Sequence, residues 1–230
     1  DYLSKSGFNQ AKFYNDLNSN ERNLLGSEQL KWIEDSISKS NANWTIFGQQ
    51  VLMTKLEFPD ITKMIKEEEI PSFVKPYLKF LGLGIPSNLD AWDGYPKERD
   101  RLFKLMSNAK KQFISLAGDT HNSWVSELED SSGKKVGIEL GAPSVTSPGI
   151  TDLLNLNKKK FIDGIVDINK ELQWMDPSNR GFLSLDFIND SVSATFHFIE
   201  KLDTISTKLK SSQSFKIKRE GLKLKKSNLN

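Results

Sequence analysis

The spacing of apolar residues predicts two amphipathic helices in the first half of the chain. Apolar side chains recur every three or four residues over Ser27–Lys39 and over Lys97–Lys110, as on the buried stripe of a helix. Ser27 is a suitable N-cap. Shorter helices are expected over Asp60–Glu69 and around the lysine run 158–160. The expected inward-facing residues of the two long helices are Leu30, Ile33, Ile37, Leu102, Leu105 and Met106.

Continuous apolar runs predict three buried strands. They lie at Trp44–Met53, Phe113–Ala117 and Val136–Leu140, and each is followed by glycine or polar residues. Polar residues that follow such strands are candidate binding or catalytic residues, because ligands of α/β proteins bind beyond the ends of the strands.

Alternating apolar and polar residues predict two hairpins near the end of the chain. Segments 181–188 and 192–198 alternate on either side of Asn189–Ser191, a strong turn signal. This alternation turns His197 away from the core, so we interpret it as a surface histidine. Within the basic C-terminal segment 203–230, apolar and basic residues alternate around a Glu-Gly turn, which predicts a basic edge hairpin that discourages aggregation.

Composition indicates a globular chain and excludes several functions. The 230 residues are 37% hydrophobic and 10% aromatic, enough to bury one sizeable core. The net charge of +2 gives no nucleic-acid-binding signature, and no run of roughly eighteen apolar residues exists to form a transmembrane segment. Because the chain has no cysteine, disulfides, zinc knuckles and thiol catalysis are excluded.

Candidate chemistry concentrates in Ser115–Trp124, which reads SLAGDTHNSW. Asp119 and His121 stand two positions apart, just after the predicted strand and Gly118. Both side chains can turn into a cleft at the strand end, where a carboxylate oxygen and an imidazole nitrogen suit a metal ion. The alternative is a structural turn, because Gly-Asp is a common turn former and a single histidine at a strand end often has a packing role.

A pair of glutamines follows the strand predicted at Trp44–Met53. Strands that end together in an α/β sheet place their following loops around one crevice. Gln49 and Gln50 are therefore expected to face Asp119 and His121.

The segment Asp90–Arg99 places aromatic, acidic and basic residues just ahead of the second long helix. Asp93 can ligate a metal or orient a ligand from behind. Arg99 can contact a phosphate or form a structural salt bridge. Trp92 and Tyr95 are interpreted as residues that hold the loop.

Four blocks of sequence, in this order, resemble the PhoD-type phosphatases and phosphodiesterases, the alkaline phosphatase D family. The blocks are LGSEQLKWIEDSISKSNANWTIFGQQVLM, WDGYPKERDRLFKLM, FISLAGDTHNSW and APSVTSPG. The resemblance runs from about Leu25 to Leu202 and concerns the C-terminal half of the family's catalytic domain. The combination of WDGYPxxR with GDTHNSW is its most specific part.

The resemblance implies a metallophosphoesterase-like fold, a layered α/β (α+β) sandwich with C-terminal β-hairpins. Enzymes of this kind hydrolyse phosphate mono- or diesters, because their metal ions polarise the phosphoryl oxygens and activate a bound water. The implied cofactors are iron and calcium, and the implied partner is a phosphate-ester substrate. Gly118–His121 stands where the wider superfamily has its last metal-binding block, Gly-His-x-His.

Residue roles follow from the same resemblance. Asp119 and His121 become the implied metal ligands and catalytic residues. The wider superfamily has His-His where this chain has its two glutamines, and an amide carbonyl serves calcium better than iron. The residues implied to touch the substrate or to support the ligands are Asn122, Gln49, Gln50, Asp93 and Arg99.

The superfamily's early metal-binding blocks, such as Gly-Asp-x-x-Tyr and Asp-His-Glu, do not occur in this sequence. We therefore expect residues 1–230 to form one partial domain that requires an N-terminal half of the catalytic domain as its partner. The isolated chain is then expected to be inactive. The family also implies a periplasmic or extracellular location, although no signal segment is visible.

Two alternatives to a phosphoesterase stay open. A non-catalytic descendant of the fold would bind an anionic ligand or a partner protein through the same cleft. A calcium-binding structural module would use Asp93, Asp119 and the glutamines without turnover. Early metal-binding blocks in the upstream coding sequence would favour the enzyme.

Overall fold

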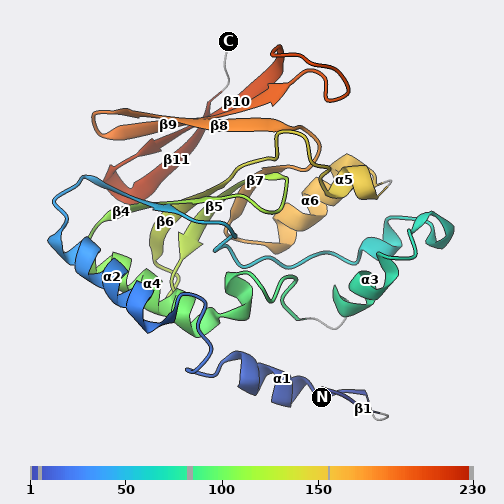
Figure 1. Ribbon diagram of the computed structural model, residues 1–230, viewed down its shortest axis with the longest axis horizontal. Coiled ribbons are helices and arrows are strands. Elements are labelled where there is room, and N and C mark those ends of the chain that lie inside the picture. The colour runs from blue at the N-terminus through green and yellow to red at the C-terminus, as the bar shows by residue number, and fades with distance from the viewer. Residues whose placement is uncertain (1, 5–6, 82–84, 155, 228–230) are drawn as a thin grey trace.

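A computed structural model describes residues 2–4, 7–81, 85–154 and 156–227 of the chain. The elements form three layers, with helices on one side of a central five-stranded sheet and a four-stranded sheet on the other side (Figure 1). The mixed α/β sandwich expected from the sequence is confirmed. No helix among the described residues is long and apolar enough to cross a membrane.

The central sheet has the strand order β3-β4-β6-β5-β7. Its strands are β3 (Trp44–Gly48), β4 (Gln112–Ala117), β5 (Ser123–Glu129), β6 (Lys135–Gly141) and β7 (Leu172–Asp176). β4 pairs in parallel with both β3 and β6, so these three strands end at the same edge of the sheet. We expected the strands that begin near Trp44 and Phe113 to lie in one sheet, with their following loops at the same edge. This expectation is confirmed.

The strand predicted at Trp44–Met53 is shorter than expected. β3 ends at Gly48, and the backbone amides of Met53 and Thr54 donate to the Glu139 carboxylate, at 2.7 and 2.8 Å, instead of pairing with a strand. The apolar residues after Gly48 are buried in a loop. A run of apolar residues therefore indicated burial here, but not a strand.

Three helices cover one face of the central sheet. They are α2 (Gly26–Lys39), α4 (Pro96–Ala109) and α6 (Lys158–Ile168), which confirms both long predicted helices. α2 and α4 pack against Phe113 and Val136 of the sheet. The Glu98 carboxylate accepts from the Leu24 and Leu25 amides, and so connects α4 to the start of α2.

The remaining helices, and the first two strands of the chain, are short. The helix expected over Asp60–Glu69 is two separate turns, because Lys66 has an extended backbone with ψ of 141°. The short elements are β1 (Leu3–Ser4), β2 (Gly7–Phe8), α1 (Gln10–Leu17), η1 (Ile61–Lys63), η2 (Glu67–Glu69), α3 (Lys75–Leu81), η3 (Trp92–Gly94), α5 (Ile150–Leu153) and η4 (Glu220–Leu222).

The outer sheet consists of the two predicted hairpins. Its order is β11-β10-β9-β8, all antiparallel, and its strands are β8 (Gly181–Ile188), β9 (Ser191–Ile199), β10 (Leu209–Lys218) and β11 (Lys223–Ser227). Phe215 and Ile217 of β10 are buried against Ile114 and Ile138 of the central sheet. His197 points outward as expected, stacked on Phe182 with ring centroids 4.8 Å apart.

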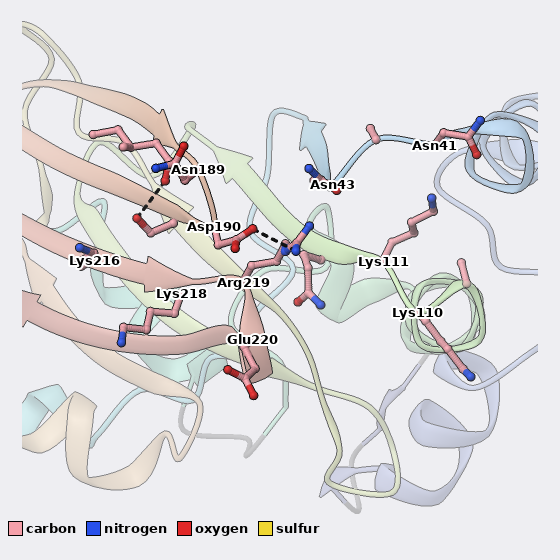
Figure 2. A pocket seen from close by; sticks show the side chains of 15 residues that line it. Asn41, Asn43, Lys110, Lys111, Asn189, Asp190, Lys216, Lys218, Arg219 and Glu220 are labelled. Carbon is pink, nitrogen blue, oxygen red and sulfur yellow. Dashed lines mark hydrogen bonds and ion pairs between the residues drawn. The ribbon is translucent and has the colours of Figure 1, made fainter.

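The two edges of the layered structure carry different features. The loops that follow β3, β4 and β6 line a cavity of about 310 Å³. The opposite edge, where β4 begins, carries a groove of about 970 Å³ (Figure 2).

Candidate functional site

The loop after β4 has an unusual backbone conformation. Asp119 and His121 have φ angles of 64° and 59°, in the left-handed region that costs an L-residue roughly 1–2 kcal/mol. The Gly118 amide donates to the Gln50 carbonyl at 3.0 Å, which fixes the start of the loop beside the end of β3. Strain of this kind in non-glycine residues is concentrated at functional sites.

One ring nitrogen of His121 forms a hydrogen bond, and this bond fixes which nitrogen carries the hydrogen. Nδ1 lies 2.9 Å from the Pro148 carbonyl oxygen, which can only accept a hydrogen bond. The Nδ1 atom therefore carries the hydrogen, and in the neutral ring Nε2 keeps its lone pair. His121 thus presents a nitrogen that can bind a metal or accept a proton.

The Asp119 side chain is exposed, and its carboxylate has no hydrogen-bond partner in the part of the chain that the structure describes. Both of its oxygens can therefore accept a ligand without the loss of an existing contact.

Four predicted site residues line one cavity. Asp93, Asp119, His121 and Asn122 surround the space of about 310 Å³ at the end of β4. Its other walls are mainly apolar, with Tyr77 among them. The four residues thus share one cavity, and their roles toward a metal or a substrate stay predictions.

Asn122 is buried and already hydrogen-bonded. Its Nδ2 donates to the Thr120 carbonyl at 2.6 Å, and its Oδ1 accepts from the Ile150 amide at 3.2 Å. The side chain therefore shapes the loop and joins it to the start of α5.

Asp93 and Arg99 form a buried ion pair beside the cavity. Arg99 Nη1 lies 2.8 Å from Asp93 Oδ1 and donates to the Met53 carbonyl at 3.0 Å. Asp93 Oδ2 accepts from the Leu56 amide at 3.0 Å. Burial raises the pKa of Asp93, while the positive charge of Arg99 opposes that rise. The pair holds the loop after β3 in place, which is the structural alternative foreseen for Arg99.

Gln49 does not face His121 as expected. Gln49 Nε2 donates to Ser115 Oγ at 3.0 Å, and Gln49 Oε1 accepts from Trp92 Nε1 at 2.5 Å. Gln50 is exposed, and neither glutamine lines the cavity. The reason is that β3 ends at Gly48, so the next residue turns toward the neighbouring strand and the η3 segment.

Two buried charged residues around the site were not foreseen. Glu139, fully buried on β6, accepts hydrogen bonds from Met53, Thr54 and Ser115, and burial raises its pKa against the opposing effect of these donors. A glutamate inside the apolar strand VGIELG was the only sequence signal for it.

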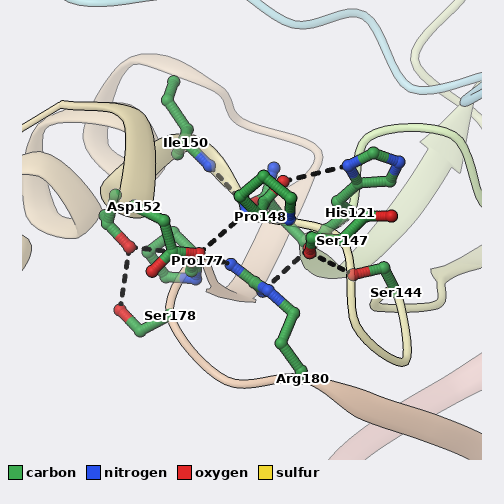
Figure 3. Close-up of polar contacts among 12 residues, drawn as sticks. His121, Ser144, Ser147, Pro148, Ile150, Asp152, Pro177, Ser178 and Arg180 are labelled. Atoms are coloured by element: carbon green, nitrogen blue, oxygen red, sulfur yellow. Dashed lines mark hydrogen bonds and ion pairs between the residues drawn. The ribbon is translucent and has the colours of Figure 1, made fainter. Parts of the chain in front are cut away.

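Arg180, at the start of β8, is the second. It is 2% exposed, donates to the carbonyls of His121 and Asn179 at 2.9 and 2.8 Å, and pairs with Asp152 (Figure 3). The buried guanidinium therefore joins the His121 loop, the α5 helix and the outer sheet. No local pattern in the sequence predicts this role, because the partners that connect the segments, His121 and Asp152, are distant from Arg180 along the chain.

Comparison with known proteins identifies the family. The sequence model of the PhoD-like phosphatases matches residues 1–196. Alkaline phosphatase D of Bacillus subtilis (strain 168) is 28% identical over 167 residues, which cover 70% of this chain and 24% of that protein. A solved structure of PhoD shares the fold, with a TM-score of 0.67 and 21% identity over 91% of this chain and 36% of that one.

The chain thus spans about a quarter of the length of its curated relative. The family match covers most of the sequence and includes the strands of the central sheet, the cavity loops and most of the first hairpin. On this evidence from sequence, with the fold in agreement, the chain belongs to the PhoD-like phosphatase family.

Proposed function

We propose that this chain supplies part of the active site of a metal-dependent phosphoesterase that hydrolyses phosphate mono- or diesters. The observation that supports the proposal best is the loop after β4. There, a carboxylate without a partner on Asp119 and an available Nε2 on His121 line one cavity, next to strained backbone. Membership of the PhoD-like phosphatase family supports the reaction class.

The donor set suits the metals that the family implies. An imidazole nitrogen and a carboxylate suit iron, and a carboxylate also suits calcium. A metal bound there would polarise a phosphoryl oxygen and lower the pKa of a bound water. The chain's own residues orient the ligands: the Pro148 carbonyl fixes the His121 ring, and Arg180 holds the backbone of that residue.

We also propose that further metal ligands come from protein outside these 230 residues. In the described part of the chain, no group of three or more acidic or histidine side chains is placed to hold a metal ion. Alkaline phosphatase D of Bacillus subtilis is much longer than this chain, since the matched residues cover 24% of that protein.

The calcium-binding structural module receives less support. That alternative needs Asp93 and the glutamines to converge on Asp119. The Asp93 carboxylate is instead occupied by Arg99 and the Leu56 amide, and Gln49 is bonded to Ser115 and Trp92.

Replacement of Asp119 tests the proposal in the complete protein. Asp119→Ala is expected to lower activity on p-nitrophenyl phosphate and its bis ester by at least about 100-fold and to reduce bound metal, because a ligand is lost. The unfolding free energy should change by less than about 1.5 kcal/mol, because the side chain is exposed, while alanine tolerates the left-handed backbone at this position less well than aspartate. Metal content by atomic spectroscopy, steady-state kinetics and urea unfolding are the measurements.

The matched control is Asp203→Ala, at another exposed aspartate. It should leave metal content and turnover unchanged. Full metal content and full turnover in Asp119→Ala would contradict the ligand assignment. Robust iron- and calcium-dependent turnover by the 230 residues alone would contradict the proposal that ligands are supplied from outside.

A further inference from the structure

A wide hollow of the described structure lies away from the candidate metal site. This groove of about 970 Å³ runs between the start of β4 and the turns of the outer sheet (Figure 2). Gln112, the first residue of β4, lines it, whereas Asp119 follows the other end of that strand. A strand of six residues separates the two by roughly 20 Å. The groove is therefore a separate feature of the surface.

Positive charge is concentrated in this groove. Five cationic side chains line it against two acidic ones, although the whole chain carries a net charge of only +2. The five are Lys110, Lys111, Lys216, Lys218 and Arg219, and the acidic residues are Asp190 and Glu220. Figure 2 shows Lys110 and Lys111 on one side, Lys216 and Lys218 on the other, and Arg219 between them.

Most of these charges are not neutralised within the protein. Arg219 pairs with Asp190 at 3.0 Å, and Lys111 Nζ donates to the neutral Ser40 carbonyl at 2.6 Å. Within the described ranges, Lys110, Lys216 and Lys218 have no acidic partner. Exposed ammonium groups held around one hollow attract anions.

The basic surface continues into a neighbouring hollow of about 260 Å³. The two hollows share Lys110, Lys111 and Gln112, and the second adds Lys134 and Lys135. Lys135 pairs with an acidic residue, and Lys134 donates only to a serine hydroxyl. The cationic surface is therefore elongated, which matches a chain of anionic groups better than a single ion.

The uncharged lining also indicates the chemistry of the ligand. Asn41, Asn43 and Asn189 contribute amide groups that can donate to phosphate oxygens. No aromatic residue lines either hollow within the described structure, so nothing there would stack on a nucleobase.

We propose that this groove binds a linear chain of phosphate groups, through the lysines on both of its sides, at a site distinct from the metal site. The proposal does not depend on catalysis, so it can be tested on the 230-residue chain itself. Inorganic polyphosphate of medium chain length is the probe, because it presents phosphates without sugars, bases or lipid tails.

Charge reversal provides the test. Lys110→Glu/Lys218→Glu changes one lysine on each side of the groove. Its matched control, Lys66→Glu/Lys201→Glu, makes the same change of net charge at exposed lysines outside both hollows. The groove variant is expected to bind polyphosphate at least tenfold more weakly by isothermal titration calorimetry, since each replacement turns an attractive charge into a repulsive one. The control should retain wild-type affinity, and circular dichroism should show both variants folded.

Several outcomes would overturn the proposal. Equal affinity of the groove variant and the wild type would show that binding occurs elsewhere, and equal weakening of both variants would show an effect of net charge alone. Absence of polyphosphate binding by the wild type would refute it, as would preferential binding to single-stranded DNA or to vesicles containing phosphatidylglycerol. Weak binding of orthophosphate beside tight binding of polyphosphate would support a chain-shaped ligand.

Discussion

Arg180 acts at the residue scale as the connection between segments that surround the candidate site. Its side chain is buried, and its Nε has no hydrogen-bond partner among the described residues. A buried unsatisfied donor costs roughly 1–3 kcal/mol. The arginine is held there by its bonds to His121, Asn179 and Asp152.

The tight packing around Arg180 leaves no room for a side chain at Gly149. A Cβ atom there would lie 2.2 Å from Arg180 Nη2 and 2.5 Å from Asn122 Oδ1. Gly149→Ala is therefore expected to lower the free energy of unfolding by at least about 2 kcal/mol, because two side chains without free space must move. Urea unfolding of the 230-residue chain measures the change.

Gly118→Ala is the matched control in the neighbouring loop. The nearest atom to its added Cβ is 4.0 Å away, so the stability should change by less than about 1 kcal/mol. Equal stability of the Gly149 and Gly118 variants would show that the contacts around Arg180 are looser than described.

At the scale of elements, the sequence predicted the helices and strands that bury one face and expose the other, because their apolar residues then recur with a regular spacing. α2 and α4 bury one stripe, and both hairpins alternate around clear turns. β5 was not predicted, because SWVSELE begins inside the motif that suggested a loop. The strand is also buried on both faces, with Trp124 in the core beneath the helices and Val125 in the core beneath the outer sheet, so it lacks a simple alternation of apolar and polar residues.

The candidate site was predictable to a similar extent. The loop with Asp119 and His121 follows a recognisable strand. Its supports could not be predicted, because Pro148, Glu139 and Arg180 act through contacts between residues far apart in sequence. The direction of the Gln49 side chain depended on where β3 ends, and apolar residues buried in the following loop concealed that end.

The β10 strand is a core element despite its many polar residues. Phe215 is 2% exposed and packs against Trp174 and Phe196, with ring centroids 5.3 and 6.1 Å away. Phe215→Ala is expected to cost about 3–5 kcal/mol of unfolding free energy, because it leaves a cavity between the two sheets.

Phe182→Ala provides the comparison on the same sheet. Phe182 is 47% exposed on the outer face, so its removal should cost less than about 1.5 kcal/mol in the same urea titration. A loss for Phe215→Ala as small as that would place β10 outside the cooperative core.

At the scale of the whole molecule, the Glu171 carboxyl group links stability to pH. Burial raises the pKa of Glu171, just before β7, from 4.5 to about 7. Between these values the unfolded chain releases the proton while the folded chain retains it, so stability decreases as pH rises through this window. The contribution is fully present below about pH 4.5 and lost above about pH 7.

Glu171→Gln removes this titration. The variant is expected to be more stable than the wild type at pH 8 by on the order of 1–3 kcal/mol, and nearly equal to it at pH 4. Urea unfolding at both pH values checks the sign. Glu68→Gln, at an exposed position, should leave the difference between pH 4 and pH 8 as in the wild type.

The position of β10 between β9 and β11 has a consequence for biosynthesis. Ile114, Ile138 and Leu140 leave the ribosome long before Phe215 and Ile217, which complete the layer that covers them. A nascent chain that has reached residue 199 therefore carries the central sheet with half of its cover missing. During this interval the uncovered face exposes apolar surface of the kind that aggregates, and translation must pass residue 217 before the layer can close.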